Sequence, residues 1–98
     1  MTGLRFTWDP RKADSNRRKH GVSFEEATSV FLDETALLLD DPDHSADEDR
    51  FVLLGVSVRQ RTLVVCHCYR EDDEIIRIIS ARRATRREAQ AYANRKLP

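Results

Sequence analysis

The sequence has no hydrophobic run that approaches the roughly 20 residues needed to cross a membrane as a helix. Its first eight residues, Met1 to Trp8, also lack the apolar core of a secretory signal peptide, so we expect a cytoplasmic protein without membrane contact. Only two cysteines are present, Cys66 and Cys68, and in a reducing compartment they are expected to stay as thiols. Linkers, repeats and low-complexity tracts are absent too, which predicts one domain over residues 1–98.

Net charge is also lacking, although charged residues are abundant. They make up 35% of the chain, against roughly 25% in an average globular domain. The two signs are segregated: residues 33–49 carry eight acids and no Lys or Arg, whereas residues 75–98 carry seven bases and one acid, Glu88. This asymmetry allows a basic face that could bind phosphate on a chain of zero net charge. Alternatively, the two blocks pair with each other.

The most informative segment is FTWDPRKADSNRRKHGVSFEEA, residues 6–27, which predicts two short helices joined by a tight corner. Asp9 is a suitable N-cap for a helix whose first residue is Pro10, and Gly21 can end that helix in a left-handed conformation. Ser23 and Glu26 then form the pattern of a capping box, which predicts a second helix immediately after the corner. A basic cluster at residues 17–19 lies next to this corner.

Alternating or apolar runs predict strands at residues 4–8, 35–39, 51–57, 61–70 and 75–81. Thr85 and Glu88 form a second capping-box pattern, which opens a final helix. The predicted order is β-α-α-β-β-β-β-α. Because the last strands are consecutive and their connections are short, we expect an α+β fold in which helices pack on one face of an antiparallel sheet.

The last two predicted strands indicate that the other face of this sheet is open. In residues 61–70, His67 alternates with Val65 and Tyr69 on one face. In residues 75–82, Arg77 lies between two isoleucines, a costly position unless that face is wet or the guanidinium is paired. Arg77 therefore belongs to the open face, and Arg70 and Arg82 need a bulge or a strand end to join it.

The segment at residues 6–27, together with HSADEDR at 44–50, FVLLGVS at 51–57 and IRIISARRATRRE at 76–88, resembles the BrnT family of bacterial type II toxins. The resemblance implies a RelE-like ribonuclease fold, cleavage of RNA without a cofactor, and arrest of translation. It also implies a ribbon-helix-helix antitoxin, BrnA-like, as partner, with operator DNA contacted only through the toxin–antitoxin complex.

Cleavage of RNA by internal transfer without metal needs a base for the 2′-hydroxyl, an acid for the leaving oxygen, and cations around the phosphorus. His44 lies in a polar loop and is the candidate proton carrier, unless it is an exposed histidine paired with neighbouring aspartates. His20 is better explained as a residue at a helix C-terminus, and His67 as a sheet histidine with its hydrogen bonds made.

Arginines are the stronger candidates for the phosphate. Arg70, Arg77 and Arg82 come from adjoining strand ends, and a planar guanidinium can bind a phosphate through two hydrogen bonds. Ion pairs with the acids at residues 71–73 are the alternative. The candidate RNA-binding residues are Lys12, Lys19, Arg83, Arg86, Arg87 and Tyr92. Here the alternatives are a merely solvated helix face for the bases and a core position for Tyr92.

No metal site is expected from the sequence. Cys66 and Cys68 point to one face of their strand and His67 to the other, so the three side chains cannot reach one zinc ion. The loop that begins at Asp41 starts like a calcium-binding loop but has neither its glycine nor its closing glutamate. The resemblance to the BrnT family implies an endoribonuclease toxin; the alternative is a non-catalytic module whose open sheet face binds protein or nucleic acid.

Overall fold

The computed structural model describes residues 3–40 and 50–95. In chain order its elements are β1 (Arg5–Thr7), α1 (Pro10–His20), α2 (Phe24–Ser29), a 3₁₀ turn η1 (Val30–Leu32), β2 (Leu37–Asp40), β3 (Phe51–Val56), β4 (Thr62–Arg70), β5 (Ile75–Arg83) and α3 (Arg86–Asn94). This is the α+β class and the element order expected from the sequence, with strand ends that differ by one or two residues.

The helix boundaries follow from local capping. The side chain of Asp9 accepts a hydrogen bond from the N–H of Arg11, and Pro10 opens α1. Gly21 ends α1 with φ of 70°, a left-handed conformation that glycine adopts without steric cost. Ser23 then caps α2, and at Thr85 both hydrogen bonds of the expected capping box are present.

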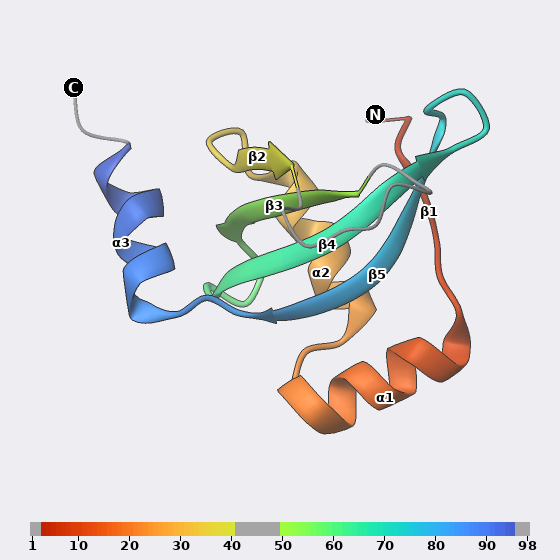
Figure 1. The fold of residues 1–98 in the computed structure, drawn as a ribbon, viewed down its shortest axis with the longest axis horizontal. Coiled ribbons are helices and arrows are strands. Elements are labelled where there is room, and N and C mark those ends of the chain that lie inside the picture. Colours follow the sequence, from red (N-terminus) through yellow and green to blue (C-terminus); the bar gives the residue numbers. More distant parts are fainter. Residues whose placement is uncertain (1–2, 41–49, 96–98) are drawn as a thin grey trace.

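The five strands form one sheet in the order β1-β5-β4-β3-β2 (Figure 1). The pairs β2–β3, β3–β4 and β4–β5 are antiparallel, as expected. β1 departs from the expectation because it pairs with β5 in parallel. Two helices separate β1 from the rest of the sheet in sequence, and such a long connection allows the first strand to return beside the last in either direction.

One irregularity in β5 decides how its side chains are distributed. Opposite Cys66 and His67, which are consecutive in β4, the partners in β5 are Ser80 and Ile78. Ile79 is therefore an extra residue, a β-bulge, and the alternation of faces is reset there. As a result Arg77 and Arg82 lie on the same face, although strict alternation along the strand would separate them.

The main core lies on one face of the sheet, between the strands and the α1–α2 corner. It contains Phe24, Ala27 and Val30 from α2 and η1, packed against residues such as Leu63 and Ile78 that are at most 1% exposed. His67 is buried in the same layer, where its ring packs edge-on against Phe31. A buried apolar layer of this kind is the main source of stability in a chain of this length.

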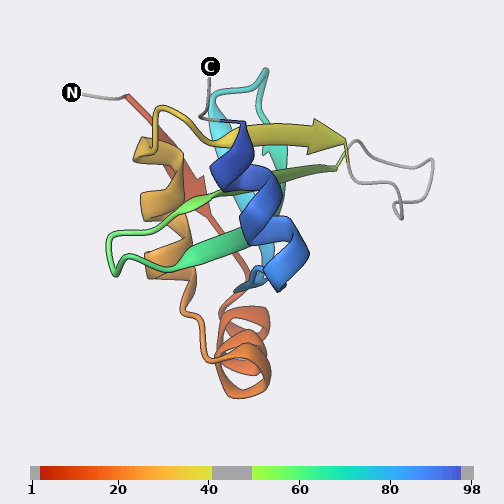
Figure 2. The same ribbon diagram turned by 90° about the vertical axis from the view of Figure 1, so that its left-hand side faces the viewer.

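The expectation that all helices lie on one face of the sheet is wrong for α3, which packs on the other face. Its Tyr92 packs against Leu54 and Val64, whose neighbours Leu53 and Val65 point into the main core on the opposite side. Figure 1 shows α2 behind the strands and α3 at the end of the sheet where β5 finishes; Figure 2, seen from that end, shows α3 in front of the strands and α2 to their left. α3 thus covers only one corner of the second face.

α1 is joined to β5 by one buried side chain, Asn16. Its amide nitrogen donates to the carbonyl oxygens of Ala81, at 2.8 Å, and Val22, at 3.0 Å. Its amide oxygen accepts from the N–H of Ala81 at 3.1 Å. Since β1 pairs with β5 only as far as Arg77, the side chain of Asn16 provides the hydrogen bonds that another strand would otherwise provide at Ala81.

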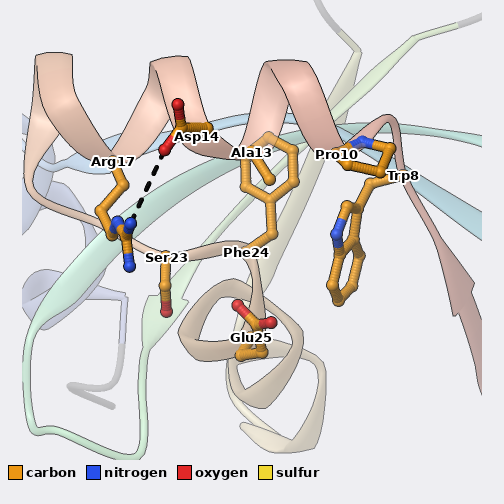
Figure 3. Close-up of a pocket in the computed structure, with 8 residues that line it drawn as sticks. All are labelled: Trp8, Pro10, Ala13, Asp14, Arg17, Ser23, Phe24 and Glu25. Carbon is orange, nitrogen blue, oxygen red and sulfur yellow. Dashed lines mark ion pairs between the residues drawn. The ribbon is translucent and has the colours of Figure 1, made fainter.

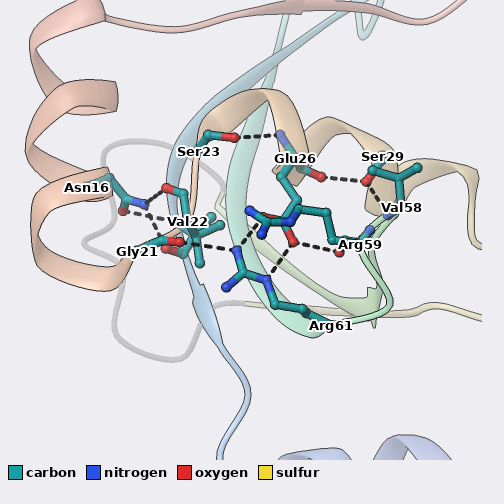
Figure 4. A network of polar contacts seen from close by, with 11 residues as sticks. Asn16, Gly21, Val22, Ser23, Glu26, Ser29, Val58, Arg59 and Arg61 are labelled. Atoms are coloured by element: carbon teal, nitrogen blue, oxygen red, sulfur yellow. Dashed lines mark hydrogen bonds and ion pairs between the residues drawn. The ribbon is translucent and has the colours of Figure 1, made fainter.

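The corner between the helices is joined to the β3–β4 turn by a second polar network (Figure 4). Glu26 is 5% exposed and binds Arg61 through both carboxylate oxygens, and it also accepts a hydrogen bond from Ser57 at 2.7 Å. Arg61 in turn donates to the carbonyl of Gly21 at 3.1 Å. These contacts use the Glu26 carboxylate, so the predicted capping box at α2 is only half formed. Hydrogen bonding to Arg61 lowers the pKa of Glu26 despite its burial.

Replacing Asn16 tests the connection between α1 and β5. We expect Asn16→Ala to lower the free energy of unfolding by about 2–4 kcal/mol, because it leaves buried backbone groups of Ala81 and Val22 without partners. Ser15→Ala, an exposed neighbour on α1, should change it by less than about 0.5 kcal/mol. The measurement is denaturant unfolding followed by circular dichroism. Equal stability of the two variants would contradict the assignment.

His67 predicts a second effect, on the pH dependence of stability. Burial lowers the pKa of its imidazole, so the unfolded chain takes up a proton near pH 6.5 that the folded chain refuses. The free energy of unfolding should therefore fall as the pH drops from 7 to 5, by at most about 1.4 kcal/mol per pH unit from this group. His67→Leu should show a shallower decline over the same range in urea titrations. Parallel curves for the two proteins would show that His67 does not contribute.

Candidate nucleic-acid interface

Four arginines share the sheet face opposite the main core. The bulge places Arg77 and Arg82 there, and Ile75 lies on the same face because it is two residues from Arg77. Arg70 pairs with Ile75 across β4, and Arg5 pairs with Ile75 across β1, so both join this face. We call Arg5, Arg70, Arg77 and Arg82 the arginine face. The sequence-predicted trio thus shares one face, but not one strand end as the sequence suggested. Arg70 and Arg77 lie near the start of β5, whereas Arg82 is opposite Val64, six residues along β4 from Arg70.

Arg5 was missed by sequence reasoning. Nothing in residues 4–8 indicates that this strand pairs with β5, because strand order depends on how the two helices return the chain across the sheet. The sequence did offer one signal for Arg5, which is a charged residue between the apolar Leu4 and Phe6 in a short predicted strand. Arg5 is exposed, and its partner strand β5 also carries Arg77.

Arg82 is engaged by α3. Its guanidinium binds the Glu88 carboxylate through two hydrogen bonds of 2.9 and 3.0 Å, a geometry that carboxylates and phosphates share. The pair is partly exposed, and Glu88 also accepts a hydrogen bond from the N–H of Thr85. Together these bonds lower the pKa of Glu88 to about 2. The ion-pair alternative therefore applies to Arg82, but its partner is Glu88 and not one of the acids at residues 71–73.

Arg77 differs from Arg82 in its surroundings. Its side chain is half-buried next to the buried Cys68 and the parallel strand β1, where Thr7 is its partner. Within residues 3–40 and 50–95 the structure gives it no ion pair with a carboxylate. Arg70 is exposed at the end of β4. Of the trio, Arg77 is the residue with a strand on each side, β1 at Thr7 and β4 at Cys68.

The predicted RNA-binding bases lie in two groups. Lys12 and Lys19 are exposed on α1, where they line a hollow of about 210 Å³ beside β5. Arg83, Arg86 and Arg87 are exposed where β5 ends and α3 begins. Basic side chains therefore lie beside β5 in two places. One group, on α1, is next to the bulge, and the other is where β5 ends and α3 begins.

Tyr92 occupies a core position, which was the alternative to RNA binding that the sequence left open. The residue is 5% exposed, and its hydroxyl donates to the carboxylate of Asp33 at 2.5 Å. Asp33 also accepts from the N–H groups of Thr35 and Val56. Burial opposes its ionisation, yet these hydrogen bonds lower the pKa of Asp33 below its usual range. In this arrangement Tyr92 attaches α3 to β3 and does not offer its ring face for stacking with a base.

The histidines are dispersed. His44 lies outside the described residues. His20 is half-buried in the last turn of α1. His67 is fully buried, as expected of a sheet histidine, but only its Nδ1 has a partner, the carbonyl of Val65 at 3.2 Å, whereas Nε2 has none. Among the described residues, no group of three His, Cys, Asp or Glu side chains is arranged to hold a metal ion.

A pocket of about 260 Å³ lies on the other side of α1, between Trp8 and the start of α2 (Figure 3). Phe24 forms part of its wall, and Asp14 and Glu25 bring two carboxylates to it. The base in this pocket, Arg17, is already paired with Asp14 at 3.6 Å. Because carboxylates repel phosphate, this pocket is a poorer candidate for RNA than the arginine face.

Comparison with known proteins identifies the family of this chain. The family model for the ribonuclease toxin BrnT of type II toxin–antitoxin systems matches residues 8–88. The chain belongs to the BrnT family of ribonuclease toxins, and membership implies ribonuclease activity and a cognate antitoxin. No curated protein sequence matches it.

Among solved structures, the chain is similar to the crystal structure of the Brucella abortus ribonuclease toxin BrnT. The two are 25% identical with a TM-score of 0.66, and the match covers 85% of this chain and 99% of that one. The resemblance inferred from the sequence is confirmed, and so is the expected α+β fold with a mostly antiparallel sheet, apart from the parallel β1 and the position of α3. No helix in the described part of the chain is long and apolar enough to span a membrane.

Proposed function

We propose that this toxin cleaves RNA by internal transfer without a metal ion and so arrests translation in the cytoplasm. The observation that carries the proposal is the arginine face, where the bulge at Ile79 brings Arg77 and Arg82 to one side of the sheet. Guanidinium groups held by a sheet can stabilise the charge that develops on a phosphate during cleavage. Family membership supplies the activity, and the arginine face supplies a site for it.

In the reaction, the 2′-oxygen attacks the adjacent phosphorus while the bond from phosphorus to the 5′-oxygen breaks. A base takes the proton from the 2′-hydroxyl, and an acid gives one to the leaving 5′-oxygen. Arg77 and Arg70 bind the non-bridging oxygens of this phosphate. Arg82, which lies opposite Val64, four residues along β4 from the partner of Arg77, binds a neighbouring phosphate in place of Glu88. His44 is the proposed proton carrier. The products are a 2′,3′-cyclic phosphate and a free 5′-hydroxyl.

The exposed bases Lys12, Lys19, Arg83, Arg86 and Arg87 are proposed to bind backbone phosphates on either side of the cleaved one. Tyr92 is left out of this set because its ring is buried and its hydroxyl is bonded to Asp33. We also propose that the cognate antitoxin is a ribbon-helix-helix protein. It neutralises the toxin by covering the basic surface with acidic side chains, and operator DNA is contacted only through the complex.

Arg77→Ala should lower the rate of RNA cleavage by about 10²–10³-fold, the usual cost of losing one charge-stabilising donor. Arg59→Ala is the matched control, since it removes the same charge from an exposed turn residue. Both variants should keep the wild-type circular dichroism spectrum, and EDTA should leave wild-type cleavage unchanged.

In bacteria, expression of the wild type should arrest growth with RNA breakdown, and Arg77→Ala should relieve both. Full growth arrest by a folded Arg77→Ala protein would contradict the site. Intact RNA during wild-type arrest would contradict the activity, and loss of cleavage in EDTA would contradict the metal-free chemistry.

The antitoxin surface is tested by reversing charge where β5 meets α3. Replacing Arg83, Arg86 and Arg87 with Glu should weaken binding of the cognate antitoxin, measured by isothermal titration calorimetry, because like charges then face each other. The same reversal at Arg11, Arg17 and Arg18 of α1 is the control for net charge. Equal Kd values for the two triple variants would show that the surface is elsewhere.

A further inference from the structure

The hollow between α1 and the bulge of β5 has walls from two distant parts of the chain. α1 contributes Lys12, Ser15, Asn16, Lys19 and His20, and β5 contributes Ile79 and Ser80. Its volume is about 210 Å³. The extra residue of the bulge, Ile79, lines it directly. The irregularity that aligns the arginine face thus also shapes this hollow.

The hollow carries positive charge from its two lysines, because Asp14, the acid of α1, forms its ion pairs outside it. Asp14 pairs with Arg17 and Arg18, which lie on other faces of the helix, at 3.6 and 2.6 Å. No carboxylate lines the hollow, and within the described ranges neither Lys12 nor Lys19 has an ion pair. The lysines are seven residues apart, about 10 Å along the helix, so both can reach one strand of nucleic acid.

The hollow opens onto the arginine face. Ser80 pairs with Cys66, which lies on the same face of the sheet as Cys68, the partner of Arg77. Ser80 is therefore common to both surfaces, between Arg77 and Arg82 along β5. Arg77 and Ser80 are about 10 Å apart at the usual rise of a strand, which a single RNA strand can cover within a few nucleotides.

We propose that this hollow is a second subsite of the RNA site, in which Lys12 and Lys19 bind the phosphates of nucleotides that flank the one at Arg77. The inference rests on the proposed ribonuclease function. Ser15, Ser80 and His20 offer hydroxyl and imidazole groups to a ribose, and Ile79 gives the hollow an apolar wall. Its ligand is a single-stranded RNA backbone, read without regard to sequence.

The probe for this subsite is a short single-stranded RNA in which every 2′-hydroxyl is methylated, so that it binds but cannot be cleaved. Its affinity is measured by fluorescence anisotropy at a series of salt concentrations. We expect Lys12→Ala/Lys19→Ala to reduce the slope of log K against log salt by about 1.4, since each phosphate contact on a single strand contributes about 0.7. Arg17→Ala/Arg18→Ala is the matched control, because it removes the same charge from the same helix outside the hollow.

A second readout separates this subsite from the cleavage site. With cleavable RNA, the double lysine variant should raise KM and leave kcat unchanged, whereas Arg77→Ala lowers kcat. Equal slopes for the lysine and arginine variants would show a general effect of net charge and overturn the subsite. If the wild type cleaves RNA and the double lysine variant has the same salt slope and KM, the subsite is overturned but the ribonuclease function is not. If the wild type neither binds nor cleaves RNA, the ribonuclease function is overturned as well.

Discussion

The extra residue at Ile79 is the constraint on which the arginine face depends. Side chains of a strand alternate between faces, so one inserted residue exchanges the faces of everything beyond it. In β5 this exchange occurs after Ile78, which stays in the core, and before Ala81, which returns to it. The charged residues on either side of the bulge are thereby left together on the opposite face. A single strand can then contribute both to the core and to the arginine face.

Local signals in the sequence were sufficient for the elements but not for their arrangement in space. Caps at Asp9, Ser23 and Thr85, and the glycine at position 21, depend only on neighbours in the chain, and the structure confirms them. The direction of β1 and the side on which α3 packs depend on contacts between distant residues. Glu26 illustrates the difference, since its local role as a cap gave way to a buried ion pair with Arg61, 35 residues away.

The candidate site was predictable to a similar extent. The sequence identified Arg70, Arg77 and Arg82 as a group, and it indicated that a bulge or a strand end was needed to bring Arg70 and Arg82 to the face of Arg77. It could not locate that bulge, because nothing in IIRIISARR distinguishes Ile79 from its neighbours. Nor could it identify Glu88 as the partner of Arg82, since that pair depends on the angle at which α3 leaves the sheet.

Asn16 has a consequence for the behaviour of this chain in a crowded cell. A strand with unpaired N–H and C=O groups is a template on which a strand of another molecule can assemble. Past Arg77, no strand within residues 3–40 and 50–95 pairs with the outer side of β5, and the hydrogen bonds of the Asn16 amide occupy Ala81 at that edge. The side chain of Asn16 therefore keeps the backbone groups of Ala81 from pairing with a strand of another copy at this edge of the sheet.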